Sequence, residues 1–372
     1  MTHDAPVALE YVARLAPYVP GKPIEDLARE LNLDPATIVK LASNENPRGP
    51  SPAVIAAIAA AAAEVTRYPD GYGYHLKDAL SKRLGVTPAQ IVLGNGSNDI
   101  LELATMAYLR PGDAAVYSQH AFAVYPLATL ARGARTIEVP ARDLAHDLPA
   151  MRAAITPETR IVFVANPNNP TGTWIAPAAL EAFIDSVPRD VLVVLDEAYN
   201  EYLEPADRAD SVGWVARYPH LAVSRSFSKA YGLAALRIGY GVMSAAVADM
   251  FNRVRQPFNV NALAQAAAVA ALADTAYVDD SRALNKHGLA QLYAGLAALG
   301  IPYVPSHGNF VLAKVGEAAR INHALLLRGV IVRPVASYGL PEYLRISVGL
   351  PAENERFLAA LREILDRDTA SR

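Results

Sequence analysis

The sequence predicts an α/β protein with a large domain, in which helices cover a mostly parallel central sheet, and a smaller α+β domain. Two observations support this prediction. Short, continuously apolar runs alternate with helical segments through the middle of the chain, which is typical of strands that are buried on both faces. In addition, the 372 residues are too many for one typical domain, since about 150 residues per domain is usual.

The expected elements follow in chain order. Strands of the central sheet are expected at 91–93, 114–117, 135–139, 161–165, 191–195, 221–223 and 238–242. Helices are expected from the turn after 93 to about 109, then at 122–131 and 177–186. After about residue 255, helical sequence continues to about 299, followed by strands at 309–315, 330–333 and 344–348 and by helices near 317–327 and 352–366.

These patterns divide the chain into three expected parts. Residues 46–255 would form the large domain and residues 256–372 the small C-terminal domain. Residues 1–45 find no place in the central sheet, and we expect them to pack on the small domain or on a partner subunit.

Composition excludes several classes of function. The 34 Lys and Arg against 37 Asp and Glu leave a net charge of -3, which gives no basic surface for nucleic acid or for an acidic membrane. Without cysteine, the chain has no disulfide, thiolate metal site or Cys nucleophile, and its eight histidines lack metal-ligand spacing. The chain starts without the features of a signal peptide, and its alanine-rich stretches are shorter than the ~20 residues of a membrane span, so a cytoplasmic location is expected.

Polar segments follow four of the predicted strands, at the sheet edge where ligands bind in open α/β sheets. They lie at 94–99, 166–172, 196–199 and 224–233. The glycines of the first segment precede a helix and could bring backbone N–H groups to a phosphate, although Ser97 could equally cap an ordinary turn. In the second segment, two prolines and a glycine fix a rigid loop with polar side chains.

Two charged residues in these segments suggest chemistry. Asp196 directly follows a buried strand, which is costly unless the carboxylate is paired, but it could also simply cap a loop. Lys229 lies in a Ser- and Gly-rich turn, where desolvation would lower its pKa and free an amine nucleophile, whereas a lysine seen alone is usually solvated. Arg237, eight residues further on, could bind the same anion as this turn.

Three motifs occur in a fixed order: Asn169-Pro-Thr-Gly, then Asp196-x-x-Tyr199, then Ser226-x-Ser228-Lys229 with Arg237 eight residues later. In combination they resemble the pyridoxal-phosphate-dependent aminotransferases of fold type I. The segments 41–47, 67–70, 309–310, 332–334 and 344–349 are similar to the histidinol-phosphate aminotransferases in particular. The resemblance extends from about residue 18 to 349.

The resemblance implies bound pyridoxal 5′-phosphate and gives its contacts. Lys229 would bond covalently to the cofactor and carry the proton between substrate and cofactor, and Asp196 would pair with the ring nitrogen. Asn169 and Tyr199 would form hydrogen bonds with the phenolate oxygen. The cofactor phosphate would be held by Gly96, Ser97, Ser226, Ser228 and Arg237.

Two aromatic positions depart from, or extend, this pattern. Phe122 falls where the family often has a tyrosine stacked on the cofactor ring, with Tyr125 as the alternative if the alignment is shifted. Tyr68 matches a residue that reaches the cofactor phosphate of the other subunit, so the resemblance implies a homodimer with shared active sites. Taken alone, Tyr68 could equally be a packed aromatic residue.

For the substrate, Arg345 matches the arginine that holds the anionic group, and Arg333, Asn309 and Tyr18 are further candidates. The activity that the resemblance implies is amino transfer between glutamate and imidazole-acetol phosphate, which yields L-histidinol phosphate and 2-oxoglutarate in histidine biosynthesis. Alternatives are an aromatic-amino-acid aminotransferase, a threonine-phosphate decarboxylase and a non-enzymatic regulator that binds the cofactor. The segment before Asn44 is too short and insufficiently basic for the DNA-binding domain of such a regulator.

Overall fold

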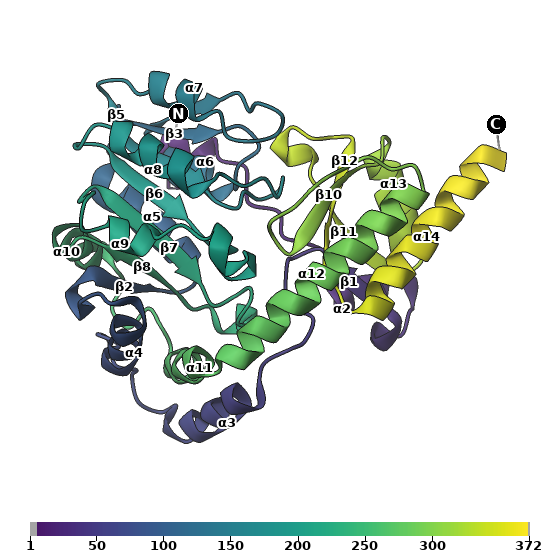
Figure 1. Cartoon of the computed structure of the whole chain (residues 1–372), viewed down its shortest axis with the longest axis horizontal. Helices are drawn as coiled ribbons and strands as arrows, with labels where there is room; N and C mark the ends of the chain where they lie inside the picture. Colours follow the sequence, from purple (N-terminus) through teal and green to yellow (C-terminus); the bar gives the residue numbers. More distant parts are fainter. Residues whose placement is uncertain (1–5, 371–372) are drawn as a thin grey trace.

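A seven-stranded sheet with the order β2-β8-β7-β6-β5-β3-β4 forms the centre of the larger part of the molecule (Figure 1). Its strands are β2 (Ile91–Gly94), β3 (Ala114–Ser118), β4 (Arg135–Val139), β5 (Thr159–Ala165), β6 (Leu192–Asp196), β7 (Leu221–Ser226) and β8 (Gly239–Met243). Only β8 runs antiparallel to its neighbours, so the prediction of a mostly parallel sheet is confirmed. The computed structural model describes residues 6–370.

Helices cover this sheet on both faces. Along β6, Val193 and Leu195 pack into one hydrophobic cluster, while Leu192 and Val194 pack into another on the opposite face. This alternation explains why the strand is a continuous apolar run. The helices of this part are α3 (Pro52–Ala61), α4 (Tyr74–Leu84), α5 (Ser97–Tyr108), α6 (Val124–Leu130), α7 (Leu148–Ala153), α8 (Pro177–Ser186), α9 (Ser211–Trp214), α10 (Ala245–Val254) and α11 (Ala262–Ala273).

The smaller part contains a five-stranded sheet with the order β1-β11-β12-β10-β9. Its strands are β1 (Val39–Leu41), β9 (Tyr303–Val304), β10 (Phe310–Lys314), β11 (Val330–Pro334) and β12 (Tyr343–Ser347). Three helices pack on one face of this sheet: α12 (Thr275–Ala298), α13 (Ala318–Leu326) and α14 (Pro351–Ala370). β1 pairs in parallel with β11, whereas the other neighbours are antiparallel.

Helices α11 and α12 show where the two parts meet. The alanines of α11 and the first residues of α12, Tyr277 and Val278, belong to the core of the large part, while Leu289 and Leu296 of α12 belong to the core of the small part. Small alanine side chains let α11 lie close against α3 (Figure 1), so the packing of the large part includes residues beyond 255.

The N-terminal segment connects the two parts a second time. Tyr11, in α1 (Glu10–Ala13), lies against Gly133 of the large part, where an added Cβ would come 3.1 Å from the tyrosine ring. Further along, Leu27 of α2 (Ile24–Leu31) packs with Ile331 of the small sheet. The segment thus runs from the large part to the small part, as the purple trace in Figure 1 shows.

Short 3-10 helices complete the described chain: η1 (Pro35–Thr37), η2 (Ala62–Glu64), η3 (Pro88–Gln90), η4 (Asn200–Tyr202), η5 (Pro205–Asp207), η6 (Ala234–Leu236) and η7 (Ala336–Tyr338). Within residues 6–370, no helix has both the length and the apolar composition needed to cross a membrane.

Candidate active site

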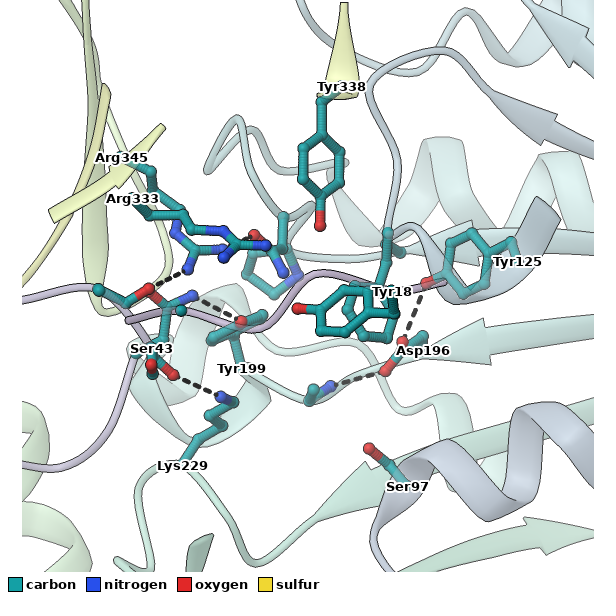
Figure 2. Close-up of a pocket in the computed structure, with 18 residues that line it drawn as sticks. Tyr18, Ser43, Ser97, Tyr125, Asp196, Tyr199, Lys229, Arg333, Tyr338 and Arg345 are labelled. Carbon is teal, nitrogen blue, oxygen red and sulfur yellow. Dashed lines mark hydrogen bonds between the residues drawn. The ribbon is translucent and has the colours of Figure 1, made fainter. Parts of the chain in front are cut away.

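A cavity of about 200 Å³ lies where the carboxyl ends of the parallel strands meet the small sheet (Figure 2). The predicted site residues that line it are Tyr18, Ser97, Phe122, Asn169, Asp196, Tyr199, Lys229, Arg333 and Arg345. These residues come from both parts of the molecule and from the N-terminal segment. The fold therefore assembles most of the predicted site in one place.

Asp196, the last residue of β6, lies buried beside this cavity. Its Oδ2 accepts a hydrogen bond from the Tyr125 hydroxyl at 2.9 Å, and its Oδ1 accepts one from the N–H of Ala198 at 3.2 Å. Burial raises the pKa of Asp196 to about 6, although the Tyr125 hydrogen bond acts in the opposite direction. Both hydrogen-bond donors are neutral groups, so a cation in the cavity would stabilise this carboxylate strongly.

Lys229 follows β7 and reaches the same cavity. Its Nζ donates a hydrogen bond to the carbonyl of Ser43 at 3.2 Å. Burial, together with the nearby guanidinium groups of Arg345 and Arg237, lowers the pKa of Lys229 to about 8. An amine with a pKa near neutrality has an appreciable neutral fraction, which is the form that acts as nucleophile and base.

The predicted phosphate-binding residues gather at the N-terminus of α5. Gly96 precedes this helix with a φ of 87°, and a Cβ added there would lie 2.2 Å from Nη2 of Arg237. Nη1 of Arg237 donates to Oγ of Ser228 at 3.3 Å, and the N–H of Ser228 donates to Oγ of Ser226 at 3.0 Å. Ser97 is the first residue of α5 and has no side-chain cap before it. A helix N-terminus, a guanidinium and hydroxyl groups together fit a phosphate.

Tyr199 and Asn169 enter the cavity from the loops after β6 and β5. The Tyr199 hydroxyl accepts a hydrogen bond from Nδ2 of Asn44 at 2.9 Å. Burial raises the pKa of Tyr199 to about 12, so the hydroxyl keeps its hydrogen at neutral pH. Oδ1 of Asn169 accepts a hydrogen bond from Arg345, which leaves its amide NH₂ available. Both side chains can therefore donate to an oxygen anion in the cavity.

Two arginines of the small sheet face the cavity (Figure 2). Arg333 in β11 and Arg345 in β12 are direct partners across the antiparallel strands. Arg345 is 6% exposed, and its Nε has no hydrogen-bond partner among the described residues. The guanidinium of Arg333 lies 5.8 Å from the ring centroid of Tyr18. Like charges in directly opposed positions repel each other, so the pair favours a bound anion.

Besides Gly96, Ser226, Ser228 and Arg237 of the phosphate-binding group, two predicted site residues, Tyr68 and Asn309, do not line this cavity. Nδ2 of Asn309 donates to the backbone carbonyls of Asn44 at 3.0 Å and Glu45 at 3.3 Å, so this side chain supports the loop after β1. Tyr68 is 83% exposed and stacks on Phe258 with ring centroids 4.8 Å apart. Substrate contact by Asn309 and cofactor contact by Tyr68 stay predictions, and the second requires another subunit.

Two further tyrosines line the cavity, Tyr125 and Tyr338. Tyr125, the alternative to Phe122 for ring stacking, is fully buried; its ring stacks on Phe163 at 4.7 Å and its hydroxyl binds Asp196. Its position three residues after Phe122, on the same side of a predicted helix, is the sequence feature that points to Tyr125. Tyr338 ends η7, and its carbonyl lies against Nδ1 of His120 from the large part. Nothing in the sequence marks Tyr338.

Comparisons with known proteins agree with this site. Residues 36–361 match the family model described as aminotransferase class I and II. The chain is 63% identical to histidinol-phosphate aminotransferase 1 of Thiobacillus denitrificans, over 97% of this chain and 94% of that protein. The chain belongs to the histidinol-phosphate aminotransferase family. A second member, histidinol-phosphate aminotransferase 2 of Pseudomonas aeruginosa, is 60% identical over 96% of this chain and 97% of that protein.

Solved structures of aminotransferases have the same fold. The histidinol-phosphate aminotransferase of Sinorhizobium meliloti in complex with pyridoxal-5′-phosphate aligns with a TM-score of 0.89 and 31% identity, over 96% of this chain and 97% of that chain. The Thermus thermophilus aspartate aminotransferase with maleate aligns with a TM-score of 0.82 and 25% identity, over 97% of this chain and 99% of that one. The predicted fold, that of the fold type I transferases, is confirmed.

Proposed function

We propose that this aminotransferase uses pyridoxal 5′-phosphate to transfer an amino group between L-histidinol phosphate and 2-oxoglutarate. The observation that carries the choice of substrate is the direct pairing of Arg333 with Arg345 across β11 and β12. A phosphate monoester is largely dianionic at neutral pH and has three acceptor oxygens, whereas an α-carboxylate has a single charge and two. Two opposed guanidinium groups, with the Tyr18 ring beside one of them, match the phosphate better.

The residues around the cavity fit the cofactor. The Gly96 and Arg237 cradle would hold its phosphate, Asp196 its ring nitrogen and Lys229 its aldehyde carbon. When bound, pyridoxal phosphate supplies an electron sink for the bonds at the substrate Cα. A lysine whose pKa lies near neutrality and a buried carboxylate in the same cavity are what such a group needs.

The chain's own groups then perform the proton transfers. Lys229 would take the proton from the substrate Cα and deliver it to the cofactor, since its pKa of about 8 allows both protonation states near neutrality. Asp196 would keep the ring nitrogen of the cofactor protonated, because a carboxylate buried in this way is stabilised by a cation. Arg345 and Arg333 orient the substrate through its anionic group, so glutamate would use the same arginines through a carboxylate.

We also propose that two copies of the chain form a homodimer with shared active sites. Three tyrosines in the segment 68–74 are strongly exposed, at 83% for Tyr68, 81% for Tyr72 and 68% for Tyr74, and Phe258 beside Tyr68 is 47% exposed. Neighbouring aromatic groups exposed to this extent are typical of an interaction surface. In the dimer, Tyr68 would reach the cofactor phosphate of the other subunit. The cytoplasmic location expected from the sequence stays a prediction.

A half-reaction experiment tests the substrate. The purified protein is loaded with pyridoxal phosphate, and the visible absorbance of the bound cofactor is followed after addition of one amino donor. Rapid loss with L-histidinol phosphate and little change with L-phenylalanine supports the proposal. The reverse result moves the function to aromatic amino acids, and release of CO₂ from threonine phosphate would identify a decarboxylase.

Mixing two inactive or impaired variants tests the shared site. In a mixed dimer of Lys229→Ala and Tyr68→Ala chains, one site combines Lys229 of one chain with Tyr68 of the other. If Tyr68 acts across the interface, refolding the two variants together yields more activity than either homodimer. If Tyr68 acts only within its own chain, the mixture shows no gain.

A further inference from the structure

Asn44 lies at the contact between the small sheet, the N-terminal segment and the cavity. It follows β1 with a φ of 54°, a left-handed conformation that asparagine tolerates better than most residues. Its side chain is 1% exposed and lines the cavity. The sequence places it in the 41–47 segment, and none of the roles considered so far requires this particular side chain.

The backbone N–H of Asn44 fixes the donor and acceptor roles in the hydrogen bonds around this residue. The backbone N–H of Asn44 contacts Oγ of Ser347 at 2.8 Å, and an N–H can only donate. Ser347 is therefore the acceptor there, and its own hydrogen is free for Oδ1 of Asn44, also at 2.8 Å. The amide oxygen of Asn44 consequently faces Ser347, and the amide nitrogen faces away from it.

The amide nitrogen faces Tyr199. Nδ2 of Asn44 lies 2.9 Å from the Tyr199 hydroxyl oxygen, and an amide NH₂ donates and does not accept. The hydroxyl must then accept this bond, which leaves its single hydrogen for another partner. Tyr199 lines the cavity (Figure 2), so a group bound there can be that partner.

We propose that Asn44 is a positioning residue that directs the hydrogen of the Tyr199 hydroxyl towards the phenolate oxygen of bound pyridoxal phosphate. The proposal rests on the function proposed above. Because Ser347 belongs to β12, two residues beyond Arg345, the strand that binds the substrate anion also sets the direction of this hydrogen. Strand β12 of the small part thereby influences the charge on the phenolate oxygen of a cofactor that the large part holds.

The consequence is measurable on the cofactor itself. A hydrogen donated to the phenolate oxygen withdraws negative charge from the neighbourhood of the nitrogen that Lys229 contributes, and so lowers the affinity of that nitrogen for a proton. The pH midpoint of the visible absorbance change of the bound cofactor reports this affinity. Other charged or titratable groups interact with Tyr199, and the test leaves them unchanged: Arg345, Asp196, Tyr338, Lys229, Tyr125 and Tyr202.

The experiment is a spectroscopic pH titration of holoenzyme variants without substrate. Asn44→Asp keeps the shape but replaces the donor by an acceptor, so the Tyr199 hydroxyl would donate to it instead of to the cofactor. We expect the midpoint to rise by about one pH unit, the size of one hydrogen bond to a charged oxygen. Ser347→Ala, which adds no charge and frees the amide to rotate, should give a smaller rise.

A double-variant cycle separates this role from the effect of the added charge. In the Tyr199→Phe background there is no hydrogen to redirect, so Asn44→Asp should shift the midpoint by at least half a unit less than it does with Tyr199 present. Asn46→Asp is the matched control, because Asn46 is buried in the same loop but binds Ala230 and Ser281. Asn46→Asp should shift the midpoint by the same amount with Tyr199 and with Phe at position 199.

Equal shifts for Asn44→Asp in the two backgrounds would overturn the role of Asn44. This result is distinguishable from failure of the proposed function, since the titration uses no substrate. A wild-type protein that shows no visible cofactor band would overturn the proposed function and this inference with it. Thermal unfolding of each variant confirms that the titrated protein is folded.

Discussion

Replacing Asp196 by Asn should make the cofactor-free protein less sensitive to pH. Burial raises the pKa of Asp196 from 3.8 to about 6. Between these values the folded chain keeps a proton that the unfolded chain has lost, so the stability of the folded state falls as the pH rises through this window. One pKa unit corresponds to about 1.4 kcal/mol, and the full difference therefore amounts to about 3 kcal/mol at neutral pH.

The assay is urea unfolding of cofactor-free wild type and Asp196→Asn at equal protein concentration from pH 4.5 to 7.5. About 2 kcal/mol of the difference falls inside this range, and the variant should gain stability relative to wild type as the pH rises. Changes in hydrogen bonding to Tyr125 and Ala198 add an offset that does not depend on pH. A stability difference that stays constant within about 0.5 kcal/mol would refute the reasoning.

The same substitution should have the opposite effect once the cofactor is bound. With the ring nitrogen of the cofactor protonated, the carboxylate of Asp196 gains a directly paired cation, so cofactor binding stabilises wild type more than the variant. We expect Asp196→Asn to lose at least ~10²-fold in turnover, as when a preorganised charge is removed from an active site. Burial of this carboxylate thus destabilises the folded cofactor-free chain, and cofactor binding offsets that loss.

Three further outcomes test other parts of the site. Arg345→Ala should lower kcat/KM for histidinol phosphate at least ~30-fold, because a buried guanidinium contact to an anion is lost; steady-state kinetics measures this. Glu197→Gln removes the ion-pair partner of the largely buried Arg225 side chain and should cost about 3 kcal/mol in urea unfolding, against less than about 1 kcal/mol for Asp249→Asn in an exposed pair. Gly96→Ala should weaken cofactor binding about tenfold in a fluorescence titration, since its φ is 87° and the added Cβ has no room. Unchanged values in any of these would contradict the corresponding contact.

The central sheet could be predicted from the sequence because its signal is local. Strands buried on both faces are continuous apolar runs, and the run at 161–165 lies within β5. Other strands carry no such signal. β1 has only three residues, including Lys40, and its partner lies in β11 near the other end of the chain. β9 has two residues.

The site divides in the same way. Asp196 and Lys229 follow buried strands in motifs whose spacing is specific, so their meeting at one sheet edge could be expected. Asn44 and Tyr338 reach the cavity only because the small part packs against the large one, and no local sequence pattern predicts this packing. The packing of α11 could not be predicted for a related reason, since its alanines look alike whichever part they pack on, and the boundary near residue 255 stays a prediction.

The pairing of β1 with β11 bears on how the chain folds during synthesis. Val39 pairs with Val330, so this strand leaves the ribosome about 290 residues before its neighbour. At about 5–20 residues per second, the wait lasts roughly 15–60 s. Throughout that time Val39 and Leu41, which end up in the small core, have no sheet to join. A nascent chain stalled before residue 330 should therefore expose this apolar strand to chaperones, even after the central sheet has formed.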